Sequence, residues 1–260
     1  MPRIIGMASR THRPGQVSLE RALSKLGLAS RREAREWILA GRLSVGGSIL
    51  LDPASPVVPE RLSLSLDGKR LERPAWRTVL LHKPRGVVTT ARDPQGRRSV
   101  LDLVDLSRGY LAPVGRLDWA TSGLLLLTND TRLSDWLCDP AHEVDRTYLV
   151  TVRGEVSDAA ARRAQDGVDS DGERLAAASV VVRKRSRRES HLVVVLREGR
   201  NREVRRLFAS LGHEVARLKR VAFGGITLGD LPPGGSRELS QEELVAAFPG
   251  APIRTSRVSI

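Results

Sequence analysis

One acidic residue, Asp118, stands where a rigid scaffold would present its side chain for chemistry. It belongs to residues 115–130, GRLDWATSGLLLLTND, and precedes a Thr-Ser-Gly turn and a run of four leucines. Such a run is typical of a buried strand, so the core behind the loop would hold the carboxylate in place, which suits a nucleophile. By composition alone, an aspartate in a loop is more often a turn former or a member of a surface ion pair.

Several common catalytic motifs are missing. The sequence has no GxxxxGK[ST] loop, no GxGxxG after a strand, no HExxH and no GxSxG. It therefore gives no support for nucleotide hydrolysis, dinucleotide redox chemistry, zinc hydrolysis or the commonest serine hydrolases. Cys138 is the single cysteine and the five histidines lack metal-ligand spacing, so we expect no intramolecular disulfide, no metal and no cofactor.

Three stretches resemble the motifs of the pseudouridine synthases, in the branch that carries an S4 domain and modifies ribosomal RNA. Residues 115–130 resemble the catalytic motif, residues 145–150 (DRTYLV) the second motif, and residues 198–207 (EGRNREVRRL) the third. The resemblance extends over nearly the whole chain, from Ser18 to about Phe248. It implies the isomerisation of uridine, which breaks an N-glycosidic bond and makes a C–C bond at the same sugar carbon. Since nothing is oxidised and no group is lost, the reaction needs no cofactor.

The resemblance also implies roles for individual side chains. Asp118 would be the catalytic aspartate, which either attacks the sugar or assists cleavage of the glycosidic bond. Arg205 would hold that carboxylate charged and oriented, and Tyr148 would lie against the uracil or the ribose. When the target nucleotide is flipped out, Arg116 would fill the vacated stack or hold a phosphate, and Arg202 would bind RNA. Without the resemblance, Arg205 is more simply a phosphate-binding or surface arginine, and a core position explains Tyr148 equally well.

A small helical unit is predicted near the start of the chain. Leucine and alanine at helical spacing predict a helix over residues 18–26. An S-x-x-E capping box predicts a second helix that begins at Ser30 and ends at Gly41. Apolar residues that alternate over 43–51, around a Gly-Gly pair, predict a β-hairpin.

This unit resembles an S4 RNA-binding domain, through residues 26–35 (LGLASRREAR) and 40–47 (AGRLSVGG). The resemblance implies that one face of the second helix meets RNA phosphates, which would make binding sensitive to salt. The alternative is an arginine-rich face that is merely solvated. The arginines expected to form this basic ridge are Arg31, Arg32, Arg35 and Arg42.

The composition is that of a basic globular chain. Its 260 residues include 43 Lys and Arg against 30 Asp and Glu, a net charge of +13, and 40% are hydrophobic. This excess of positive charge indicates a partner rich in phosphate. Aromatic residues make up only 3%, which argues against a platform that stacks successive bases. The sequence has neither a run of about 18 apolar residues nor the apolar core of a signal peptide, so we expect a cytoplasmic protein with no membrane partner.

The pattern after residue 76 predicts a mixed α+β domain with largely antiparallel strands. Strands are expected at residues 79–81, 87–89, 124–128, 148–152, 180–183 and 192–196, and helices are expected to begin near residues 129, 157, 201 and 240. The basic run RKRSRR at residues 183–188 is either an exposed hairpin tip or an RNA contact. The predicted division is a flexible basic tail (1–17), an S4 domain (18–73), a catalytic domain (76–250) and a second tail (251–260).

These features together predict an enzyme that converts one uridine of ribosomal RNA to pseudouridine. We expect 23S large-subunit RNA as substrate and partner, because residues 142–148 and 198–206 resemble the large-subunit enzymes more than the small-subunit ones. The alternatives are a 16S enzyme, a non-catalytic RNA-binding factor for ribosome assembly, and a glycosylase that excises the base. We expect the enzyme to be a monomer.

Overall fold

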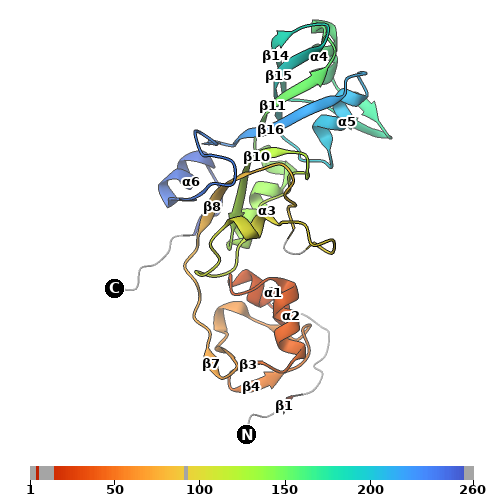
Figure 1. Ribbon diagram of the computed structural model, residues 1–260. Helices are drawn as coiled ribbons and strands as arrows, with labels where there is room; N and C mark the ends of the chain where they lie inside the picture. Colours follow the sequence, from red (N-terminus) through yellow and green to blue (C-terminus); the bar gives the residue numbers. More distant parts are fainter. Residues whose placement is uncertain (1–3, 6–14, 91–92, 255–260) are drawn as a thin grey trace.

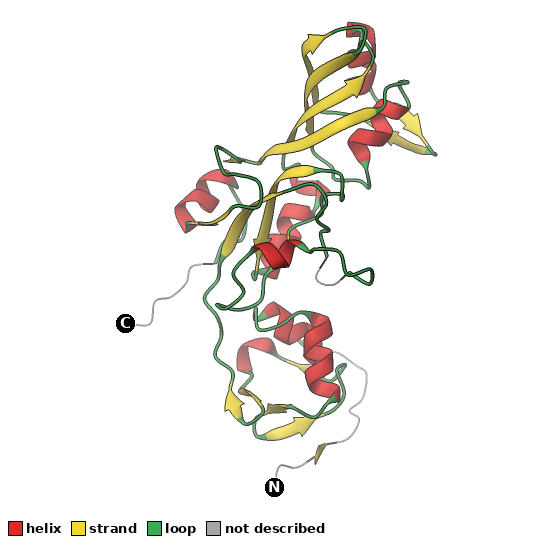
Figure 2. Ribbon diagram, in the orientation of Figure 1, coloured by secondary structure: helices red, strands yellow, loops and turns green. Residues whose placement is uncertain are grey.

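The computed structural model describes residues 4–5, 15–90 and 93–254. The chain forms a small N-terminal unit and a larger, elongated unit joined by an extended segment (Figure 1). In the small unit helices lie beside short strands, and in the large unit helices flank a long sheet (Figure 2). The predicted α+β class, with much antiparallel strand, is therefore confirmed.

Two α-helices, one 3₁₀ helix and seven short strands build the described part of the small unit. Helix α1 (Leu19–Lys25) and helix α2 (Arg31–Leu39) pack on a sheet in the order β1-β4-β3-β6-β7. The sheet strands are β1 (Ile4–Ile5), β3 (Leu43–Val45), β4 (Ser48–Leu50), β6 (Leu64–Leu66) and β7 (Lys69–Arg70), and beside them lie the pair β2 (Val17–Ser18) and β5 (Pro56–Val57) and the 3₁₀ helix η1 (Pro59–Arg61).

Local sequence explains these elements. The Ser30 side chain accepts a hydrogen bond from the Glu33 backbone N–H at 3.1 Å, which caps α2. This is one half of the predicted capping box, and the reciprocal bond from the Ser30 N–H to the Glu33 carboxylate is not found among the described residues. Gly46 and Gly47 both have positive φ, +56° and +85°, as a tight turn between β3 and β4 requires. Leucine and isoleucine side chains from both helices are fully buried against the sheet, so packing of their apolar faces holds these short helices in place.

The two predicted tails carry some structure where the chain is described. Ile4–Ile5 pairs in parallel with β4, and Val17–Ser18 pairs with β5. The rest of the predicted N-terminal tail, residues 1–3 and 6–14, lies outside the described residues, as do residues 255–260 of the predicted C-terminal tail.

A nine-stranded sheet forms the large unit, in the order β14-β15-β11-β16-β10-β8-β18, with β17 beside β16 and β9 beside β10. Among the described pairings of this sheet only β10 with β16 is parallel. The strands are β8 (Thr78–Lys83), β9 (Ala112–Pro113), β10 (Ser122–Thr128), β11 (Arg146–Arg153), β14 (Ser179–Arg185), β15 (Glu189–Leu196), β16 (Val215–Phe223), β17 (Ile226–Thr227) and β18 (Ser236–Leu239).

Helices cover both faces of this sheet and explain the leucine run. Leu125 and Leu127 join a core with helices α4 and α5, whereas Leu124 and Leu126 join a second core with α3 and α6. All four leucines are fully buried because β10 is covered on both faces. The helices are α3 (Thr131–Cys138), α4 (Asp158–Asp166), α5 (Glu203–Ala209) and α6 (Gln241–Ala247), and the smaller elements are η2 (Val100–Leu103), η3 (Pro140–His142) and the pair β12 (Val168–Ser170) and β13 (Glu173–Leu175).

The predicted strand at residues 87–89 is wrong. These residues are buried, but Val88 forms only an isolated bridge with Ser99. Strand β8 already pairs with β10 on one side and β18 on the other, so no edge is free for a hairpin partner. The segment instead bonds to the loop before β10, where the Thr89 hydroxyl donates to the Leu117 carbonyl at 2.8 Å.

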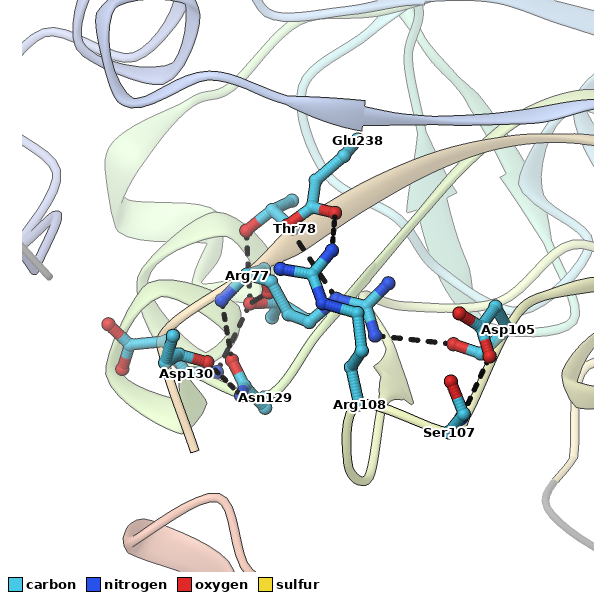
Figure 3. A network of polar contacts seen from close by, with 10 residues as sticks. Arg77, Thr78, Asp105, Ser107, Arg108, Asn129, Asp130 and Glu238 are labelled. Atoms are coloured by element: carbon cyan, nitrogen blue, oxygen red, sulfur yellow. Dashed lines mark hydrogen bonds and ion pairs between the residues drawn. The ribbon is translucent and has the colours of Figure 1, made fainter. Parts of the chain in front are cut away.

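A polar network fixes the segment that joins the two units (Figure 3). The buried Asn129 side chain accepts from the Arg77 backbone N–H at 2.9 Å and donates to the Ala75 carbonyl at 2.9 Å. Arg77 also donates to the Asp105 carbonyl at 3.2 Å. The small unit touches the same place, because a Cβ added to Gly27 would lie 3.3 Å from the Asn129 carbonyl oxygen. The joint is therefore a packed contact between the two units.

Candidate active site

The loop before β10 carries Asp118 and is tied down by backbone and side-chain contacts. The Thr121 N–H donates to the Asp118 carbonyl at 3.0 Å, closing a turn. The carboxylate itself stays one-third exposed. The loop therefore places the acid at the surface of a rigid support, as the sequence predicts.

Lys83, at the end of β8, fastens this loop and was not among the residues predicted from the sequence. Its side chain is fully buried, and its ammonium donates to three carbonyls: those of Pro84 at 3.1 Å, Asp118 at 3.1 Å and Thr121 at 2.9 Å. Burial lowers the pKa of Lys83 to about 8, and the nearby Asp118 charge opposes that shift. In sequence this lysine belongs to a Lys-Pro-Arg-Gly turn, a setting in which lysine is normally exposed.

Two arginines of the third motif face the Asp118 carboxylate. Arg202 Nη1 lies 3.6 Å and Arg205 Nε lies 4.0 Å from Asp118 Oδ2. Arg202 is half exposed, whereas the Arg205 side chain is 15% exposed and its Nη1 donates to the Val215 carbonyl of β16 at 2.9 Å. Burial lowers the pKa of Arg205, Arg202 lowers it further and Asp118 raises it. The structure therefore brings together the predicted acid and its predicted basic partner.

A cavity of about 140 Å³ opens beside this carboxylate. Tyr148, on β11, lines it and is 8% exposed, and its hydroxyl makes no hydrogen bond with any described residue. Arg116 and Arg202 also line the cavity and are exposed, whereas Arg205 does not line it. Of the five site residues predicted in the large unit, four line this cavity: Asp118, Tyr148, Arg116 and Arg202. The fifth, Arg205, contacts Asp118.

Two buried arginines in the cavity wall were also missed. Arg146 on β11 and Arg220 on β16 are 6% and 3% exposed, and the guanidinium carbon of each lies 5.1 Å from the centre of the Phe223 ring. Nothing in the local sequence separates them from surface arginines. Their burial follows from pairing between β11 and β16, which only the folded sheet establishes.

Gly123 brings the two strands of the site into close contact. It has φ of +112°, and a Cβ there would lie 2.1 Å from the Arg220 carbonyl oxygen and 2.6 Å from its nitrogen. Only glycine fits where β10 meets β16 in parallel, at the pairs Ser122 with Lys219 and Gly123 with Arg220. The Thr-Ser-Gly turn therefore lets the loop of Asp118 approach the strand that carries Arg220.

The basic ridge of the small unit is exposed but largely paired. Its ion pairs within the chain are Arg32 with Glu36 at 3.1 Å, Arg35 with Glu20 at 3.5 Å and Arg42 with Asp67 at 2.5 Å. For Arg31 no carboxylate partner is found in the described part of the chain, and the Asp67 pairing raises the pKa of Arg42. Three of the four predicted phosphate ligands would have to exchange a carboxylate for an RNA phosphate.

Neither a metal site nor a membrane span is found in the described residues. No group of three or more His, Cys, Asp or Glu side chains there is arranged to hold a metal ion. None of the described helices has the length and apolar character needed to cross a membrane.

Comparison with known proteins assigns the family. A family model described as RNA pseudouridylate synthase matches residues 77–210, just over half of the chain. The chain belongs to the RNA pseudouridylate synthase family. The S4 domain model matches residues 18–61 of this pseudouridine synthase, which confirms the predicted N-terminal domain.

The chain matches relatives along nearly their whole length. An uncharacterised RNA pseudouridine synthase of Aquifex aeolicus (strain VF5) is 35% identical over 90% of this chain and 94% of its own. The ribosomal large subunit pseudouridine synthase B of Bacillus subtilis (strain 168) is 35% identical over 87% of this chain and 93% of its own. A pseudouridylate synthase crystal structure, 26% identical, superposes with a TM-score of 0.65 over 89% of this synthase and 99% of that chain.

Proposed function

We propose that this pseudouridine synthase isomerises one specific uridine of 23S ribosomal RNA, acting as a monomer in the cytoplasm. The observation that carries the activity is the Asp118 carboxylate at the mouth of a cavity, within 4.0 Å of two guanidinium groups and beside Tyr148. The choice of large-subunit RNA is supported by the name of the Bacillus subtilis relative. We also propose the predicted division at residues 1–17, 18–73, 76–250 and 251–260, supported by the gap between the end of β7 and the start of β8.

In this proposal Asp118 acts at the ribose of an extruded uridine. It attacks the sugar or assists cleavage, the N1–C1′ bond breaks and its electron pair goes to N1 of the uracil. The ring then turns and C5 bonds to C1′; if Asp118 has attacked C1′, the bond between them breaks at this step and the carboxylate is regenerated. The C5 proton then leaves to solvent, and N1 takes up a proton. Atoms balance without a cofactor, because one C–H bond and one C–N bond are exchanged for one C–C bond and one N–H bond.

The neighbours of Asp118 supply orientation and electrostatics. Arg205 is held by β16 and keeps the carboxylate directed at the sugar. Tyr148 forms a wall against the base or the ribose, with its free hydroxyl available for proton transfer. Arg116 and Arg202 are exposed at the mouth and bind the flanking phosphates, and the S4 domain adds contacts to folded RNA through Arg31, Arg32, Arg35 and Arg42.

Release of tritium from RNA labelled at C5 of uridine tests this function. Separate 23S and 16S transcripts are incubated with wild type and with Asp118→Ala. Release from 23S RNA by wild type alone is expected. Release from 16S RNA only would assign the other subunit, and no release by wild type would favour the assembly-factor alternative. Equal release by Asp118→Ala would remove the catalytic role proposed for Asp118. Free uracil in the products would indicate a glycosylase.

A further inference from the structure

The inner wall of the cavity contains a buried guanidinium with unused donors. Arg220 lines the cavity and is 3% exposed. Its Nε donates to the Leu124 carbonyl at 2.7 Å, but its buried Nη2 has no hydrogen-bond partner. No described residue accepts from its Nη1 either. Since buried polar groups nearly always find partners, this edge of Arg220 needs an acceptor that the protein does not supply.

The surroundings of Arg220 favour an acceptor that carries negative charge. No carboxylate forms an ion pair with it in the described part of the chain, and a second cation, Arg146, lies against the same Phe223 ring. Arg146 differs because its donors are used: Nη1 donates to the carbonyls of Val144 and Arg197, and Nη2 to that of Leu137. The cavity wall therefore holds two buried guanidinium groups: both Nη atoms of Arg146 donate hydrogen bonds to carbonyls, whereas Nη2 of Arg220 has no acceptor.

The position of Arg220 relative to the reacting groups indicates which acceptor enters. Arg220 pairs with Gly123 on one side and with Tyr148 on the other, and it lines the same cavity as Asp118. With the ribose at the Asp118 carboxylate, the uracil occupies the cavity beyond it. Uracil offers the carbonyl oxygens O2 and O4 as acceptors.

We propose that Arg220 binds a carbonyl oxygen of the uracil and stabilises the negative charge that the base carries while it is detached from the ribose. This inference rests on the proposed function. When the N1–C1′ bond breaks, its electron pair is shared by N1, O2 and O4, so the acceptor becomes anionic only during the reaction. A fixed guanidinium aimed at that oxygen binds the detached base more strongly than the uridine. The charge disappears when C5 bonds to C1′ and N1 is protonated.

A comparison of two substrates separates this role from a structural one. RNA with uridine at the target position is compared with RNA carrying 5-fluorouridine there, under single-turnover conditions. Loss of the original nucleoside is followed by nuclease digestion and chromatography. Fluorine withdraws electron density and stabilises the detached base by itself, so the 5-fluoro substrate depends less on Arg220.

Arg220→Gln is expected to slow loss of uridine about 10²- to 10³-fold, with a clearly smaller loss for 5-fluorouridine and a nearly unchanged Kd for RNA. Arg200→Gln is the matched control, because Arg200 lines the same cavity but already donates to the Arg174 carbonyl at 2.8 Å. Its effect is expected to be equal for both substrates. If Arg220→Gln does not fold, Arg220→Lys is compared in the same way, with circular dichroism as the check on folding.

Three results would overturn the inference. Equal losses for the two substrates would make Arg220 a purely structural clamp. A weaker Kd with an unchanged single-turnover rate would make it a phosphate contact. A wild type that consumes neither nucleoside removes the proposed function and the inference together, whereas an active wild type with equal losses removes the inference alone.

Discussion

Arg205 faces Asp118 while its guanidinium is fastened to the sheet: Nε lies 4.0 Å from Asp118 Oδ2, and Nη1 donates to the Val215 carbonyl at 2.9 Å. The buried Nε has no hydrogen-bond partner of its own. At 4.0 Å the contact is an ion pair without a hydrogen bond, and catalytic contacts of this kind often tighten only when substrate binds.

Because of this fixed geometry, we expect Arg205→Gln to lower kcat by about 10²- to 10³-fold with little change in KM. Arg202→Gln removes the same charge from the half-exposed partner of Asp118, and should raise KM more than it lowers kcat. Steady-state tritium release measures both constants. Equal kcat losses in the two variants would mean that charge alone, and not the fastening to Val215, sets the effect.

Activity should fall as the pH rises through about 8, the pKa to which burial lowers Lys83. Below that pH the ammonium has a proton for each of three carbonyls, and the neutral amine has only two. The loop of Asp118 then loses one of its ties. A single-turnover pH profile tests this, and a rate that stays constant to pH 9.5 would contradict it.

Stability should change in the opposite direction over the same range. The pKa of Lys83 in the folded chain, about 8, lies below the ordinary 10.5, so the unfolded chain holds the proton to higher pH. Unfolding then takes up a proton between these values, and the contribution of Lys83 to the free energy of unfolding rises with pH. Urea unfolding of wild type and Lys83→Met at several pH values isolates this contribution, which the variant should lack.

Gly123→Ala should destabilise the fold by about 3 kcal/mol or more, since a Cβ would lie 2.1 Å from the Arg220 carbonyl oxygen at a φ of +112°. Gly229→Ala is a suitable control. It also has positive φ, +55°, but nothing within 4 Å of the new Cβ, so it should cost only about 1 kcal/mol. Thermal unfolding of the pair measures the difference, and similar losses would show that close approach of the strands is unimportant.

Asn129→Ala should cost about 2 to 4 kcal/mol, because it removes the partners of two backbone groups, the Arg77 N–H and the Ala75 carbonyl. Arg108→Ala removes another polar contact in the same network, the exposed ion pair with Glu238 at 2.7 Å (Figure 3). That variant should lose no more than about 0.5 kcal/mol. Urea unfolding compares the two, and equal losses would show that Asn129 does not fix the joint.

RNA binding should weaken with salt, and Arg31 should contribute more than Arg42. Arg31 has no carboxylate partner among the described residues, whereas Arg42 would have to leave Asp67. We expect Arg31→Gln to reduce the slope of log K against log salt by about 1 and Arg42→Gln to reduce it less. Fluorescence anisotropy with a 23S fragment measures both slopes. A slope unaffected by either change would make the ridge a solvated face.

Local sequence patterns predict the local structure, but only some of the residues that build the site. Capping at Ser30, the turn at Gly46 and the leucine run all depend on near neighbours in the chain, and each is predicted correctly. The loop of Asp118 is recognisable for the same reason. Lys83 and Arg220 are missed because their partners are backbone carbonyls from other strands, which carry no side-chain signature.

The mistaken strand at residues 87–89 has a related cause. Its valines and threonine suit a strand, but whether a strand forms depends on a free neighbour in the sheet. Strand β18, which closes the outer edge of β8, comes from near the end of the chain. No pattern within residues 87–89 indicates that β18 already occupies the edge of β8.

The parallel pairing of β10 with β16 also determines when the active site can form during synthesis. During synthesis the ribosome releases Asp118 and Tyr148 well before the strand that carries Arg220, and long-range pairings of this kind form late. A partly made chain therefore holds the acid without the cations that would direct it. The site is therefore complete only when translation has delivered β16.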